Sequence, residues 1–284
     1  MQGSISALIA GAIVAVLLAG PALARVWPLD LRVVMSGHSL TDPVRDPLEA
    51  MIRAAGGPRA TVELSTIPGS PLEWRWNNAP GLDLRARVAD FDVVVLTERV
   101  ALSNTVPYHN TAEYALRFSR LAWEAGAQVV LFASWVTLET GPAFAGQGAD
   151  PDAGLAWRER LDRELLAWEA IRDFVNAQRP QGAPEMRLIP AISVMAALYD
   201  EIAAGRAPID DIAVLFRDDI HPSALGAWVV ALAHYAVIYG RDPSGLTRPE
   251  GLSPAVAAWF EALVWRVVSA HPGSGISASG AAVH

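Results

Sequence analysis

The strongest constraint on the fold is a series of short apolar runs that alternate with helical patterns along the chain. Apolar, β-branched runs that stop at glycine or at polar residues are typical of buried strands. Five strands are predicted, at residues 31–35, 60–66, 92–97, 127–132 and 187–189. Helices are predicted at residues 43–55, 111–125, 153–177 and 194–204, in an apolar segment that ends near residue 239, and at residues 254–269.

Strands that alternate with helices in this way predict a mostly parallel sheet with helices on both faces. The chain has 284 residues, which is enough for one large domain with a sizeable core. No internal repeat or inter-domain linker interrupts the pattern. The sequence therefore predicts a single three-layer α/β/α domain with a five-stranded sheet over residues 25–271. The small residues from 272 to 284 are expected to form a disordered tail.

Composition and charge exclude several classes of function. The formal net charge is −8, which argues against nucleic-acid binding because phosphate backbones require a surplus of Lys and Arg. The chain has no cysteine, so a disulfide framework and a thiolate metal site are both excluded. The six histidines are scattered and form no metal-binding spacing. We therefore expect no metal site.

The first 24 residues are expected to be a secretory signal peptide. Residues 5–18 are apolar and small, and Ala22-Leu23-Ala24 makes an A-x-A cleavage pattern. The alternative is an uncleaved N-terminal anchor, because this apolar stretch nearly reaches the length of about 18 residues that spans a bilayer. Either interpretation predicts a periplasmic or secreted protein, with membrane association only through residues 5–19.

The first apolar run leads into a candidate nucleophile, Ser39. Gly37, His38 and Ser39 follow the run directly, and the carboxyl ends of parallel strands are where open α/β sheets bind ligands. A serine acts as a nucleophile only with a base, a group that orients the base, and donors for an oxyanion. These partners must come from elsewhere in the chain.

A base and its orienting group are available near the other end of the chain. His221 follows Asp218 by three residues in a loop that precedes a predicted helix. This spacing can present both side chains to one side of a tight turn, with Asp218 fixing the tautomer of His221. The alternative is that Asp218 only caps the helix that follows.

Together these segments resemble the GDSL/SGNH hydrolase family. The GHSLTD segment at residues 37–42 is similar to the GDSLTD nucleophile block, and DDIHPSALG at residues 218–226 is similar to the C-terminal DxxHPxxxG block. The resemblance implies a flavodoxin-like fold and ester hydrolysis without a cofactor. It also implies Ser39 as nucleophile, His221 as base and then acid, and Asp218 as its orienting group. The backbone N–H groups of Ser39 and Gly69 would bind the oxyanion.

Two positions depart from the family pattern. His38 replaces the usual aspartate before the serine, and its imidazole is a competing base for Ser39. The third block, GxND, would supply an asparagine amide to the oxyanion, but the chain reads LTER at residues 96–99. Glu98 stands near the asparagine position, where an ionised carboxylate would repel an oxyanion.

Several groups are candidates for the missing donor. The Asn104 side chain can fold back toward the oxyanion, or the Arg99 guanidinium can replace the amide. The side-chain amide of Asn77 or Asn78, in the preceding segment, can also donate to the oxyanion. A further alternative is a weak or inactive site. Separately, Glu98 and Arg99 can be interpreted as a local ion pair that stabilises the end of the strand.

The expected function is hydrolysis of an acyl ester, for example an acetyl ester, on a carbohydrate or other polar alcohol. The sugar component rests on the aromatic residues Trp74, Trp76 and Trp135, which are expected to be exposed near the site. Residues 72–78 are expected to form an aromatic loop. That loop either lines a ligand groove or is pinned to the body by its tryptophans. The alternatives are a non-catalytic protein of the same fold that binds glycans, and transfer of the acyl group to a second alcohol.

Overall fold

The computed structural model describes residues 26–276, which form a five-stranded parallel sheet between two helical layers. The strands are β1 (Arg32–Gly37), β2 (Thr61–Thr66), β3 (Val93–Leu96), β4 (Gln128–Phe132) and β5 (Arg187–Ile189). Their order is β2-β1-β3-β4-β5, and every neighbouring pair is parallel. The predicted fold class is confirmed, and the sheet is fully rather than mostly parallel. This strand order is the flavodoxin-like arrangement.

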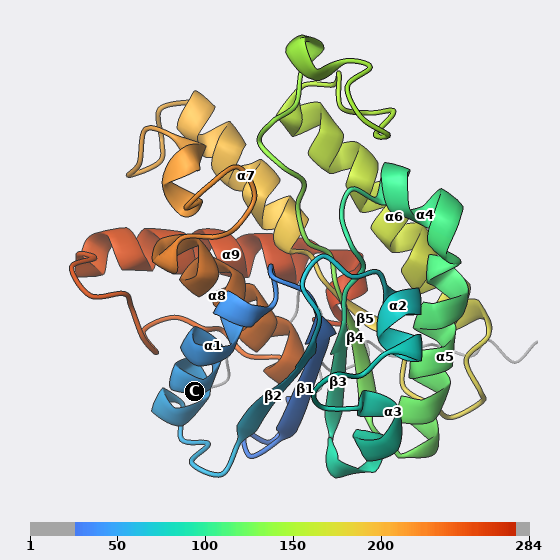
Figure 1. Cartoon of the computed structure of the whole chain (residues 1–284). Coiled ribbons are helices and arrows are strands. Elements are labelled where there is room, and N and C mark those ends of the chain that lie inside the picture. The colour runs from blue at the N-terminus through green and yellow to red at the C-terminus, as the bar shows by residue number, and fades with distance from the viewer. Residues whose placement is uncertain (1–25, 277–284) are drawn as a thin grey trace, which may run out of the picture.

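Helices cover both faces of the sheet (Figure 1). On one face lie α1 (Arg45–Ala54), α8 (Ala224–Tyr239) and α9 (Pro254–Ala270). On the other face lie α5 (Thr111–Glu124) and α6 (Trp157–Ala177). Helix α7 (Ala191–Ala203) packs against both α6 and α9. Helix α8 is buried on all sides from Gly226 onwards, which explains why its sequence is apolar all round.

Three short helices were not predicted, and all belong to the connections after β2 and β3. They are α2 (Leu72–Asn77), α3 (Leu84–Arg87) and α4 (Leu102–His109). Residues 72–78 were expected to be a loop, and this prediction is wrong. Their six-residue helix is too short to show a helical period in the sequence. Single 3₁₀ turns, which are equally short, occur at Asp42–Val44, Val88–Asp90, Pro142–Phe144, Ile212–Leu215 and Pro272–Ser274.

The two ends of the chain bear on the predicted leader and tail. The predicted signal peptide or anchor, residues 1–24, lies outside the described residues. Within residues 26–276, no helix is both long and apolar enough to cross a membrane. The tail was expected to be disordered from residue 272, but Pro272–Ser274 form a 3₁₀ turn and Ser274 is fully buried. Residues 272–276 therefore belong to the folded body.

Candidate active site

Ser39 lies in a tight turn directly after β1. The carbonyl of His38 accepts hydrogen bonds from the N–H groups of Thr41 at 2.7 Å and Asp42 at 3.4 Å, which folds the chain back into the 3₁₀ turn before α1. A Cβ at Gly37 would lie 1.9 Å from the Thr41 hydroxyl, so only glycine permits this close approach. The turn leaves Ser39 partly exposed at the carboxyl edge of the sheet.

Asp218 and His221 share a second tight turn, which leads into α8. The turn is closed by a hydrogen bond from the Arg217 N–H to the His221 carbonyl at 2.9 Å and by an isolated antiparallel bridge between Phe216 and Pro222. The alternative in which Asp218 caps the following helix is wrong. Ser223 caps α8 instead, because its hydroxyl accepts the Gly226 N–H at 3.2 Å.

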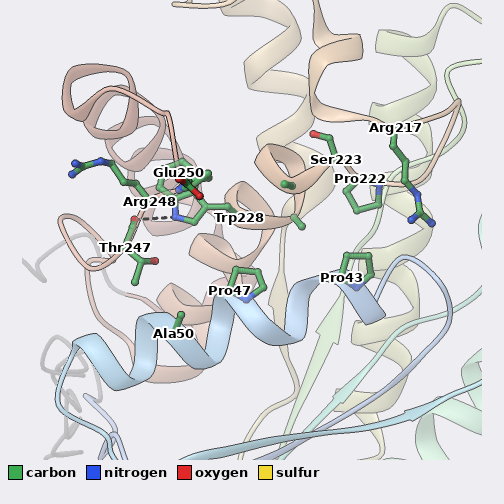
Figure 2. A pocket seen from close by; sticks show the side chains of 13 residues that line it. Pro43, Pro47, Ala50, Arg217, Pro222, Ser223, Trp228, Thr247, Arg248 and Glu250 are labelled. Atoms are coloured by element: carbon green, nitrogen blue, oxygen red, sulfur yellow. Dashed lines mark hydrogen bonds between the residues drawn. The ribbon is translucent and has the colours of Figure 1, made fainter.

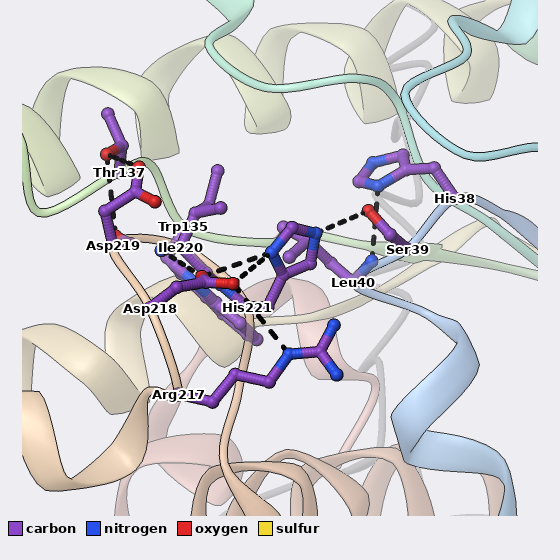
Figure 3. Close-up of polar contacts among 10 residues, drawn as sticks. All are labelled: His38, Ser39, Leu40, Trp135, Thr137, Arg217, Asp218, Asp219, Ile220 and His221. Carbon is purple, nitrogen blue, oxygen red and sulfur yellow. Dashed lines mark hydrogen bonds and ion pairs between the residues drawn. The ribbon is translucent and has the colours of Figure 1, made fainter.

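The two turns bring Ser39, His221 and Asp218 into one hydrogen-bonded chain (Figure 3). The His221 Nε2 atom lies 2.9 Å from the Ser39 Oγ atom, and its Nδ1 atom lies 2.9 Å from the nearer Asp218 oxygen. If Nδ1–H donates to the carboxylate, Nε2 is free to accept the serine proton. This is the geometry of a nucleophile with an oriented base.

The Asp218 carboxylate is held in its charged form by the backbone of its own turn. One of its oxygens accepts the N–H groups of His221 at 2.6 Å and Ile220 at 3.0 Å. These backbone hydrogen bonds are the main reason that the pKa of Asp218 falls to about 2, with a further contribution from the His221 ring. The carboxylate can therefore orient the imidazole at any ordinary pH.

Two backbone N–H groups at this edge of the sheet are free to bind an anion. Within residues 26–276, neither the Ser39 N–H nor the Gly69 N–H donates to a protein acceptor. Gly69 follows β2, the strand beside β1, and has a φ of +65° that favours glycine. The Ile67 N–H bonds the Gly37 carbonyl at 3.1 Å, which ties the Gly69 turn to the end of β1.

A buried arginine that was not predicted holds the Gly69 turn in place. Arg75 of α2 is 5% exposed, and its guanidinium donates to the Ser70 and Thr97 carbonyls and to the Ser36 hydroxyl. One side chain thus joins the turn after β2 to the ends of β1 and β3. Burial lowers the pKa of Arg75 to about 10, which still leaves it cationic at neutral pH. This role could not be predicted, because the Ser36 and Thr97 contacts are distant in the chain and the position of Arg75 depends on the unpredicted helix α2.

Glu98 is fully buried at the end of β3 and faces the start of α2. One carboxyl oxygen accepts the N–H groups of Leu72 at 3.0 Å and Arg99 at 2.6 Å. Burial raises the pKa of Glu98, and the nearby cation of Arg75 partly offsets that effect. Glu98 is therefore a structural group that satisfies backbone donors of α2, and it does not line the exposed surface beside Ser39.

His38 is not placed as a second base. Its Nε2 atom lies 3.0 Å from the Glu98 carbonyl, and its Nδ1 atom accepts the Leu40 N–H at 3.4 Å. Burial is the main cause that lowers the pKa of His38 to about 4. Both ring nitrogens are thus engaged with the backbone in the neutral form.

The candidates for a third oxyanion donor are mostly engaged elsewhere. The Arg99 guanidinium contacts Thr105 at 3.2 Å and His109 at 3.4 Å, both on α4, so a local ion pair with Glu98 does not form. The side-chain amides of Asn77 and Asn78 donate to the backbone of their own helix, α2. The side chain of Asn104, in the first turn of α4, forms no hydrogen bond within the described part of the chain.

A tryptophan that was expected to be exposed instead supports the His221 turn. Trp135 is 0% exposed, and its indole N–H donates to the Ile220 carbonyl at 2.9 Å. The neighbouring Thr137 hydroxyl bonds an Asp219 carboxylate oxygen at 2.7 Å. The segment after β4 therefore holds the turn that carries Asp218 and His221 (Figure 3).

Of the other two tryptophans expected near the site, Trp74 is exposed and Trp76 is not. The exposed fraction of Trp74 is 54%, whereas Trp76 is half-buried and packs edge-on against Phe118. The two interpretations of this segment thus apply to different residues, since Trp76 pins α2 to the body and Trp74 is available to a ligand. Within residues 26–276, no group of three or more His, Asp or Glu side chains is arranged to hold a metal ion.

Comparison with known proteins relates the chain to others through its fold. The sequence matches no protein family model and no curated protein. A DUF4886 family protein from Bacteroides uniformis has a similar structure, with a TM-score of 0.63 at 16% identity, over 84% of this chain and 94% of that one.

Proteins designated as SGNH or GDSL enzymes are also among the solved structures that the chain resembles. An SGNH hydrolase of Slackia heliotrinireducens gives a TM-score of 0.47 at 22% identity, over 72% of this chain and 97% of that one. A GDSL-like lipase of Bacteroides thetaiotaomicron gives 0.40 at 10% identity, over 72% and 85%.

Proposed function

We propose that this protein is a serine hydrolase of the GDSL/SGNH type that cleaves an acyl ester. The observation that carries the proposal is the hydrogen-bonded chain from Ser39 through His221 to Asp218, with 2.9 Å at each of its two links. Its support also includes the two motifs around these residues and the flavodoxin-like strand order. None of the proposed steps requires a cofactor.

In the proposed reaction, Ser39 Oγ attacks the ester carbonyl while His221 Nε2 takes the serine proton. The carbonyl oxygen becomes an oxyanion, which accepts the N–H groups of Ser39 and Gly69. When the ester bond breaks, His221 returns the proton to the departing alcohol, and the acyl group remains on Ser39. Water then attacks with His221 again as base, which releases the acid and restores the serine.

The proposed substrate is an acyl group, for example acetyl, on a carbohydrate or other polar alcohol outside the cytoplasm. The location rests on the N-terminal sequence, and the sugar component rests on exposed Trp74 at the start of α2, which follows the Gly69 turn. Within residues 26–276, we identify two free backbone donors for the oxyanion, those of Ser39 and Gly69, and we expect a slower rate than with a third donor. Loss of one such donor typically costs on the order of a hundredfold.

The test is the reactivity of Ser39. The purified protein should form a covalent adduct on Ser39 with a fluorophosphonate and should hydrolyse a short-chain aryl acetate. Ser39→Ala should abolish both reactions while circular dichroism and the melting temperature stay unchanged. Undiminished hydrolysis by Ser39→Ala would refute the assignment.

The second candidate is a non-catalytic glycan-binding protein of this fold. It is favoured by one sequence observation, that the chain reads LTER at residues 96–99 and so lacks the asparagine that the family pattern supplies to the oxyanion. Absence of any Ser39 adduct, together with measurable binding to glycans, would support it. Acyl transfer would use the same three residues, and product analysis with an added alcohol distinguishes it from hydrolysis.

A further inference from the structure

A groove of about 660 Å³ lies directly beside the Asp218–His221 turn. It runs between the start of α1 and the start of α8 and is closed at the far end by the segment before α9 (Figure 2). This volume is in the range of small-molecule binding sites. None of the proposed catalytic groups lines the groove, so the proposed mechanism does not account for it.

The groove is continuous with both turns of the candidate active site. Pro43 comes four residues after Ser39, Pro222 follows His221 directly, and Arg217 precedes Asp218. Arg217, Pro222 and Pro43 lie together at one end of the groove (Figure 2). A ligand in the groove would therefore approach the Ser39–His221 pair from the imidazole's own turn.

The walls of the groove are mostly apolar, with charged groups at its two ends. Pro43, Pro47 and Ala50 follow one another along one side of the start of α1 (Figure 2). Arg217 marks the end near Asp218, and its side chain is 61% exposed with only a 3.8 Å contact to that carboxylate. Arg248 and Glu250 mark the far end, and within residues 26–276 neither has an ion-pair partner. Such a lining suits an amphiphilic molecule, with hydrocarbon over the prolines and polar groups at the ends.

The proposed chemistry decides which part of an ester reaches this groove. His221 must return its proton to the departing alcohol oxygen, so the alcohol lies on the imidazole side of the scissile bond. Gly69, by contrast, leads into α2, which lies on the opposite face of the sheet from α1 and α8 (Figure 1). The carbonyl oxygen is thus directed toward one face and the alcohol toward the other.

We infer that the groove binds the hydrocarbon portion of the alcohol of an ester substrate. This inference rests on the proposed esterase function. It replaces the carbohydrate with the other proposed kind of alcohol, because Trp74, on which the sugar component rests, belongs to α2 and does not line the groove. The preferred substrate is a small acyl group on an amphiphilic alcohol whose apolar segment lies along Pro43, Pro47 and Ala50. The polar end of that alcohol meets Arg248 and Glu250.

The first experiment compares acetate esters of straight-chain alcohols from ethanol to 1-octanol. We expect kcat/KM to rise about threefold for each methylene that enters the groove. Ala50→Trp places an indole in the groove at an exposed position of α1, away from Ser39. It should lower kcat/KM for octyl acetate about tenfold or more and leave ethyl acetate unchanged. Ala54→Trp, on the same helix and exposed but outside the groove, is the matched control and should behave like the wild type.

Two results would overturn the inference. One is an Ala50→Trp enzyme that cannot be distinguished from Ala54→Trp on octyl acetate. The other result comes from a parallel series of ethyl esters, from ethyl acetate to ethyl octanoate. If Ala50→Trp lowers activity on esters with long acyl chains but not on esters of long-chain alcohols, the groove binds the acyl group and the inference is wrong.

A binding experiment separates failure of this inference from failure of the proposed function. Calorimetric titration of the Ser39→Ala variant with 1-octanol should show binding. The double variant that also carries Ala50→Trp should show none. A wild type without any Ser39 adduct and without ester turnover would refute the function, and the titration would still report on the groove. Absence of octanol binding in an enzyme that does hydrolyse acetates would refute the groove alone.

Discussion

At the scale of single residues, the site differs from its sequence expectation mainly at Glu98. The structure brings Ser39, Asp218 and His221 together, and the sequence pointed to each of them because each sits in a turn with a local pattern. The role of Glu98 was not predictable, because its carboxyl group bonds the Leu72 N–H, which is 26 residues away. A residue that was expected to repel an oxyanion is instead buried and bonds the backbone N–H groups of Leu72 and Arg99.

Replacement of Glu98 by glutamine tests this interpretation. Glu98→Gln keeps an oxygen that can accept the Leu72 and Arg99 N–H groups but removes the carboxyl group whose charge interacts with Arg75, so the unfolding free energy should fall by about 1–2 kcal/mol. Hydrolysis per folded molecule should not increase, because Glu98 does not face the reacting atoms. Urea denaturation and the rate of Ser39 labelling measure the two effects.

The control for this substitution is Glu73→Gln, at a glutamate of α2 that is about one-third exposed. Its effect on unfolding should stay below about 1 kcal/mol. A clear rise in labelling rate for Glu98→Gln would mean that its charge does repel the oxyanion.

At the scale of elements, the segment after β4 connects the helical layer to the Asp218–His221 turn. Trp168 of α6 donates its indole N–H to the Ser134 carbonyl at 3.1 Å, and Trp157 donates to Val136 at 3.1 Å. Trp135, from the segment itself, donates to Ile220. The sequence predicted the long helix and the strand on either side of this segment. It could not predict which carbonyl each indole would meet, because that depends on how the layers pack.

Trp135→Phe should loosen the catalytic turn while it keeps most of the packing. The Ile220 carbonyl loses its donor, which costs about 1–2 kcal/mol of stability. We expect kcat and the rate of Ser39 labelling to fall about fivefold to tenfold with KM unchanged, since one hydrogen bond of about 1 kcal/mol orients the turn.

Trp168→Phe is the matched control for the loosened turn. It removes an equally buried indole hydrogen bond that does not touch residues 218–221. Its stability should fall by a similar amount, with a labelling rate near that of the wild type. Equal labelling rates in the two variants would show that Trp135 has only a structural role.

At the scale of the whole molecule, buried neutral histidines should make the fold sensitive to mild acid. Burial lowers the pKa values of His38 and His234 to about 4, whereas both groups titrate near 6.5 in an unfolded chain. Between these values the unfolded state binds more protons, so stability falls as pH falls from 6.5 to about 4. Burial raises the pKa values of Glu98 and Glu164, and this opposes the trend at its lower end.

His234→Phe isolates one of these contributions far from the candidate site. His234 lies in α8 with its ring 4.6 Å from that of Phe132. The variant should lose up to about 1.4 kcal/mol per pH unit from the slope of unfolding free energy between pH 6.5 and 4.5. Denaturant titrations of both proteins across this range provide the measurement. Parallel curves for the two proteins would contradict the expected role of His234.

The separation of the two halves of the site in the chain has a consequence for when the protein becomes reactive. Ser39 meets His221 across 182 positions, and α8, which follows His221 directly, packs against α1 near the start. During synthesis, the serine emerges long before its base, and it has no partner until the last third of the chain has docked. On the proposed function, we therefore expect a partly synthesised chain to be unreactive. Reactivity should begin only once α8 and the Asp218–His221 turn have packed against the start of the chain.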